Sequence, residues 1–142
     1  MGHVWRMLVG SCVAALAASG CAQSDMTLLQ GTWRGKELGG LGQGEAVMSI
    51  SGNRVHFQGA VPKEWYKATF TLDEKASPRA LVGVIEECSF NSANGKPVRA
   101  IYKIDGDTLT FAGNEPGAET RPSTFEKGGR ARVFVLTRQK SP

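Results

Sequence analysis

The feature that most constrains this chain is a series of short segments in which apolar and polar residues alternate, each ended by turn-forming residues. From Leu28 onward, segments rich in Val, Ile, Thr, Phe and Tyr are separated by Gly, Asn, Asp and Pro. Met48 and Ile50 form one such pair, and Val55 and Phe57 form another. Side chains two residues apart lie on the same face of a strand, so these pairs predict strands with one apolar face. The sequence therefore predicts an all-β domain.

The turns between these segments predict antiparallel pairing of consecutive strands. We expect eight strands, at residues 31–38, 46–51, 54–58, 65–72, 80–90, 98–104, 108–112 and 132–138. Gly52-Asn53 and Asp105-Gly106-Asp107 supply residues that tolerate the positive φ of tight hairpins. This pattern is compatible with a barrel or a sandwich. A closed barrel has no exposed edge strands, so we favour an eight-stranded antiparallel up-and-down barrel.

The first twenty-one residues have the layout of a bacterial lipoprotein signal peptide. Arg6 precedes an apolar run from Met7 to Ala18, and small residues lead to Cys21. The run is shorter than the roughly 18 apolar residues of a membrane-spanning helix. We therefore expect residues 1–20 to be a signal peptide. Residues 21–27 would be the lipidated N-terminus and a short tether, and residues 28–142 the barrel domain.

Lipidation of Cys21 would hold an exported protein at a membrane. Ala22 follows Cys21 in place of an aspartate, and the sorting rule of well-studied Gram-negative bacteria then favours the outer membrane. The tether from Ala22 to Thr27 reaches at most about 20 Å. Cys88 is the remaining cysteine with an unblocked thiol, so we expect neither an intrachain disulfide nor a cysteine metal site. A lone cysteine in an apolar strand is typical of a buried small hydrophobe.

Charge gives little information about a partner. The formal net charge is +4, and many basic residues lie near the C-terminus. An exported chain has no access to cytosolic nucleic acid, so we expect no nucleic-acid partner. A solvated basic surface is a better explanation than binding to an anionic lipid or a cell-wall polymer. The residues concerned are Arg121, Lys127, Arg130, Arg132, Arg138 and Lys140.

The titratable residues do not suggest catalysis. His56 is the one histidine after the signal peptide, and no nucleophile motif accompanies it. Glu86 and Glu87 are neighbours on one strand and are expected to face opposite sides of it, so they would not pair. Asp105 and Asp107 fit a tight turn better than a calcium site, which needs six or more oxygens. We therefore expect no catalytic residue, metal or cofactor.

Gly31-Thr32-Trp33 resembles the Gly-x-Trp motif of the lipocalins. In that family the tryptophan closes one end of an eight-stranded barrel, and an arginine of the last strand packs on its ring. The resemblance implies that Arg138, or with less support Arg132, makes a cation–π contact with Trp33.

Longer runs resemble a family of uncharacterised exported domains that is abundant in planctomycetes and is regarded as lipocalin-like. The resemblance extends over most of residues 28–138 and implies a lipocalin-like fold and export, but no activity. The sequence departs from the family at Glu86-Glu87-Cys88. The matching runs are Leu29 to Trp33, Leu72-Asp73 with Ser77-Pro78, Ile101 to Leu109, Arg121 to Phe125, and Val135 to Arg138.

Two functions follow as hypotheses. The first is a non-catalytic binding module for a small apolar or amphipathic ligand in the cell envelope, with Met48, Phe57, Trp65 and Phe70 lining a cavity and the glycine-rich loop 35–45 as a gate. No helix is expected after the glycines of that loop, so a phosphate site is not favoured. The alternative is an envelope scaffold, interaction protein or inhibitor whose barrel is filled by its own side chains.

Overall fold

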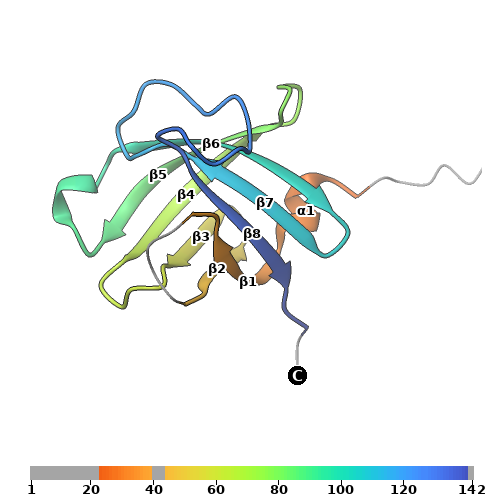
Figure 1. Cartoon of the computed structure of the whole chain (residues 1–142), viewed down its shortest axis with the longest axis horizontal. Helices are drawn as coiled ribbons and strands as arrows, with labels where there is room; N and C mark the ends of the chain where they lie inside the picture. Colours follow the sequence, from red (N-terminus) through yellow and green to blue (C-terminus); the bar gives the residue numbers. More distant parts are fainter. Residues whose placement is uncertain (1–22, 40–43, 141–142) are drawn as a thin grey trace, which may run out of the picture.

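The computed structural model describes residues 23–39 and 44–140. Its strands form one closed antiparallel barrel in chain order, with the last strand paired to the first (Figure 1). This confirms the prediction of an all-β, eight-stranded, lipocalin-like barrel, and each strand ends within two residues of its predicted limit. The elements are α1 (Asp25–Leu29), β1 (Gly31–Glu37), β2 (Ala46–Ser51), β3 (Arg54–Gln58), β4 (Trp65–Asp73), β5 (Ala80–Cys88), the 3-10 turn η1 (Asn91–Ala93), β6 (Pro97–Asp105), β7 (Thr108–Gly113) and β8 (Arg132–Arg138).

The up-and-down order gives the barrel two different ends. The turns β2–β3, β4–β5 and β6–β7 lie at one end together with α1, and we call this the closed end. The connections β1–β2, β3–β4, β5–β6 and β7–β8 lie at the other, which we call the open end. The longest of these, residues 114–131 between β7 and β8, lies at the open end.

The barrel interior contains the main core. Alternate residues of each strand point inward, as in β2, where Ala46, Met48 and Ile50 are buried. Trp33 and Leu136 from the paired strands β1 and β8 are completely buried. The apolar alternation in the sequence therefore corresponds to the inner face of the barrel.

A second, smaller core lies on the outer face of β6, β7 and β8. Ile101, Ala112 and Val133 are buried there, and Phe125 of the β7–β8 connection packs against them. The ammonium group of Lys103 lies 5.4 Å from the centre of the Phe125 ring. In Figure 1 this connection, in blue, arches past β6. It therefore covers outward-facing apolar side chains that the strand pattern alone would leave exposed.

Helix α1 packs against the closed end. Leu29 is 2% exposed within the core, and its carbonyl oxygen accepts a hydrogen bond of 2.9 Å from the Trp33 indole. Ser24 caps the helix by accepting a hydrogen bond from the backbone N–H of Thr27. Residues 25–27, which we expected to belong to an extended tether, are thus part of the folded domain. The sequence pattern missed this helix because it has only five residues.

Asp25 is the residue that holds α1 in place. Asp25 is 4% exposed, and its side chain accepts hydrogen bonds of 2.7 Å from Arg79 and from the Tyr102 hydroxyl. Its backbone N–H donates to Glu74 over 3.1 Å. Burial, followed by the hydrogen bond to Asp25, raises the pKa of Tyr102. These contacts join α1 to the β4–β5 turn and to β6.

Replacing Asp25 with alanine should lower the free energy of unfolding by about 1–3 kcal/mol, because the buried Tyr102 hydroxyl loses its acceptor. Urea denaturation followed by circular dichroism measures this change. Asp105→Ala, at an exposed position of the same end, is the matched control and should change stability by less than about 0.5 kcal/mol. Equal effects of the two substitutions would contradict the role of Asp25.

Candidate functional site

A cavity of about 300 Å³ occupies the barrel interior. At ~30 Å³ per water molecule this equals about ten water volumes, at the lower end of the range for ligand pockets. Leu29 and Tyr102 border it toward the closed end, and Phe111 and Arg132 toward the open end. It extends to Glu115, which is exposed, on the β7–β8 connection. The structure thus contains a largely apolar cavity whose polar wall residues are mostly at the open end.

Three of the four predicted lining residues border this cavity, namely Met48, Phe57 and Phe70. The fourth, Trp65, is not among them, and this prediction is wrong. Its neighbour Tyr66 lines the cavity instead, because adjacent residues of a strand face opposite sides. Counting back in steps of two from Phe70 leads to Tyr66 and would have identified the correct residue.

The predicted contact between Trp33 and Arg138 is present at the closed end. The Arg138 guanidinium lies 4.2 Å from the centre of the Trp33 ring. It also donates hydrogen bonds of 2.8 Å to the Gln30 carbonyl and 2.6 Å to the Leu28 carbonyl. Gly31 has a φ of 114°, which a residue with a side chain rarely adopts. The Gly-x-Trp motif and Arg138 therefore lock β1, β8 and the end of α1 together.

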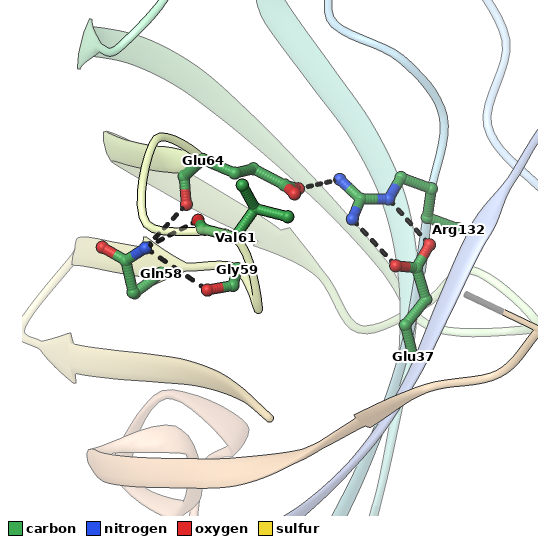
Figure 2. A network of polar contacts seen from close by, with 6 residues as sticks. All are labelled: Glu37, Gln58, Gly59, Val61, Glu64 and Arg132. Carbon is green, nitrogen blue, oxygen red and sulfur yellow. Dashed lines mark hydrogen bonds and ion pairs between the residues drawn. The ribbon is translucent and has the colours of Figure 1, made fainter. Parts of the chain in front are cut away.

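Arg132, at the opposite end of β8, lies between two carboxylates at the open end (Figure 2). Its Nε and Nη2 donate to the two oxygens of Glu37 over 2.8 and 2.9 Å, and its Nη1 donates to Glu64. The guanidinium lies 5.2 Å from the centre of the Phe134 ring and borders the cavity. Hydrogen bonds from Arg132 lower the pKa of Glu37, and those same bonds raise the pKa of Arg132.

The short β3–β4 connection places Glu64 beside Arg132. The Gln58 side-chain amide lies 3.1–3.3 Å from four carbonyl oxygens of this connection and so fixes its shape. Figure 2 shows Gln58 under the loop that carries Val61 and Glu64. A Cβ at Gly59 would lie 2.7 Å from the Glu64 carboxyl carbon, so a side chain at this position would displace the Glu64 carboxylate. Glu64 is therefore held by the local fold and does not depend on Arg132 alone.

Tyr66 brings a phenol to the cavity. Burial raises its pKa, and the negative charge of Glu64 raises it further. The phenol therefore stays neutral and can donate a hydrogen bond at physiological pH. Its hydroxyl makes no hydrogen bond to another residue in the described part of the chain.

The other residues considered for chemistry lie elsewhere. His56 is exposed on the outer surface, with its ring 6.4 Å from that of Trp65. Cys88 is buried, and its thiol donates to the carbonyl of Phe90 and to the side-chain oxygen of Asn94. The structure does not bring His56 and Cys88 together with acids in a cleft.

Glu86 and Glu87 do not face opposite sides of the sheet as predicted. Both are exposed. The pairing of β4 with β5 is irregular at this point, because Lys67 pairs with Glu87 and the next residue, Ala68, pairs with Ile85. Glu86 is thus the extra residue of a β-bulge, which interrupts the alternation of side chains.

Two predicted features lie outside the described residues. Cys21 and the signal peptide fall within residues 1–22, and the middle of the proposed gate falls at residues 40–43. Within residues 23–39 and 44–140, none of the helices is both long enough and apolar enough to cross a membrane.

Comparisons with known proteins find no matching family model, no matching curated protein and no matching solved structure.

Glu37 should make the stability of the protein sensitive to acid. A carboxyl whose pKa is lowered on folding stabilises the protein above its unfolded pKa, and this stabilisation is lost as the pH falls through the folded pKa. Because the network is partly exposed, we expect a contribution below about 1 kcal/mol. Glu37→Gln should therefore reduce the stability difference between neutral and acidic pH, measured by urea denaturation. Glu119→Gln, at an exposed position, is the control, and an unchanged pH profile for Glu37→Gln would contradict this assignment.

Proposed function

We propose that this protein is a non-catalytic binding module that holds a small apolar or amphipathic molecule inside its barrel. The observation that carries the proposal is the cavity of about 300 Å³ and its lining of hydrocarbon side chains such as Met48, Ile50 and Phe70. Moving apolar surface from water into such a cavity is favourable by about 25 cal/mol per Å².

The distribution of polar groups supports an amphipathic ligand. Toward the closed end, the Tyr102 hydroxyl already donates to Asp25. Arg132 and Asn114 border the cavity at the open end, where β8 begins and β7 ends. A ligand would therefore place its apolar part deep in the barrel and its polar head near these residues.

We further propose that the chain is an exported lipoprotein anchored through Cys21, with the outer membrane as its location. The arrangement of Arg6, the apolar run and Cys21 supports export, and Ala22 supports the location. The runs described above support membership of the planctomycete-type family of exported lipocalin-like domains.

A second candidate function is an envelope scaffold, interaction protein or inhibitor that uses the open end. Leu38, Val61 and Phe90 are 44%, 52% and 56% exposed, and each comes from a different connection at this end. Exposed apolar groups of this kind are typical of interaction surfaces. This alternative assumes a barrel that is filled by its own side chains, whereas the present barrel contains a cavity. The binding module is therefore favoured.

Native mass spectrometry of the protein purified from its own host tests the binding module. We expect one small molecule per chain, which organic extraction would then identify. Ala68 lines the cavity, so Ala68→Phe should fill part of it and reduce occupancy at least about tenfold, a difference of 1.4 kcal/mol. Thr71→Phe places the same side chain at an exposed position of the same strand and should leave occupancy unchanged. A bare mass for the unmodified protein would contradict the proposal and favour a protein partner.

Cys21→Ser tests the anchor. The variant should move from the membrane fraction to the soluble fraction and should lack the mass of a diacylglycerol group, because the serine hydroxyl does not replace the thiol in this modification. Cys12→Ser, within the signal peptide, is the matched control and should remain in the membrane fraction. An unchanged distribution of Cys21→Ser would rule out this anchor.

A further inference from the structure

The charge balance around Arg132 limits which polar head the cavity can accept. Two carboxylates, from Glu37 and Glu64, contact this one guanidinium. Among the described residues that line the cavity, Arg132 is the single cation and Glu115 the single carboxylate. The cation is thus more than neutralised by its two partners, and the lining carboxylate of Glu115 adds further negative charge.

The open end still offers hydrogen-bond donors. A guanidinium has five N–H donors, and the contacts with Glu37 and Glu64 use three of them. Within the described residues, two donors of Arg132 therefore remain, together with the neutral Tyr66 hydroxyl. The amide nitrogen of Asn114 donates to the Thr120 carbonyl over 2.7 Å, which leaves its side-chain oxygen as an acceptor.

An anionic head and an uncharged head would meet this site differently. A carboxylate would bring a third negative charge close to Glu37 and Glu64, which are 26% and 20% exposed, so that solvent screens the repulsion only in part. An ester or amide carbonyl could accept from Arg132 or Tyr66 without adding charge. The apolar part would bind equally well in both cases.

We propose that the cavity selects amphipathic ligands with an uncharged, hydrogen-bond-accepting head, such as an acyl amide or ester, and discriminates against the fatty acid of the same chain length. This inference rests on the proposed binding function. Glu37 and Glu64 are then specificity-determining residues that act through Arg132, and Figure 2 shows how they enclose its guanidinium.

Isothermal titration calorimetry at pH 8 with decanamide and with sodium decanoate tests the inference. The two probes share the acyl chain length and differ in the charge of the head. We expect decanamide to bind at least about tenfold more tightly than decanoate, a difference of 1.4 kcal/mol.

Glu64→Gln keeps the shape and an acceptor for Arg132 but removes one negative charge. It should strengthen decanoate binding at least about fivefold, since like-charge repulsion falls, and should change decanamide binding less than about twofold. Glu37→Gln provides a second, independent test with the same expected direction. Glu119→Gln, at an exposed position of the β7–β8 connection, should leave the ratio of the two affinities unchanged.

The outcomes separate the inference from the binding function. Equal or tighter binding of decanoate by the unmodified protein overturns the inference and leaves the binding function standing. An unchanged ratio in both Glu64→Gln and Glu37→Gln also overturns it. Failure of both probes to bind, together with a bare mass from the native host, overturns the binding function and the inference with it.

Discussion

The structure depends on the closure of one sheet upon itself, and the interaction that secures this closure is the packing of Arg138 on Trp33. Strand β8 pairs with β1 along five residues of each strand. Arg138 adds a cation–π contact with Trp33 and hydrogen bonds to the chain at the end of α1. First strand, last strand and helix are thereby tied at one point. Without the pairing of β1 with β8 the barrel would expose two strand edges, and without Arg138 the interior would lose part of its boundary at that end.

The two arginines of β8 illustrate how one strand can serve two purposes. Arg132 and Arg138 are an even number of residues apart, on the same side of the strand as the buried Phe134 and Leu136. At the closed end, Arg138 packs on the Trp33 ring, donates to two carbonyl oxygens and pairs with the exposed Asp107. At the open end, Arg132 meets two carboxylates and a cavity. The same residue type thus closes the barrel at one end and provides a polar boundary at the other.

The sequence was sufficient for the fold because strands and hairpins are encoded locally. Alternation and turn residues predicted all eight strands, and the Gly-x-Trp motif indicated the contact with Arg138. The group of Glu37, Glu64 and Arg132 was not predictable, because its members are 95 and 68 positions apart and no pattern connects them. Trp65 was misplaced for a local reason, since two adjacent aromatic residues begin β4 and only one can face inward. The helix α1 depends on Asp25, whose partners lie far away in the sequence, in the β4–β5 turn and on β6.

The position of α1 determines how the barrel would sit on any surface that holds its N-terminus. The helix begins directly after Ser24 and is fixed to the base of the barrel through Asp25. With attachment at Cys21, as proposed, the domain could not invert on the surface, since three residues span at most about 11 Å. In a barrel attached in this way, the closed end would face the surface and the open end would point away from it. A ligand of the cavity, as proposed, would then enter from the side facing away from that surface.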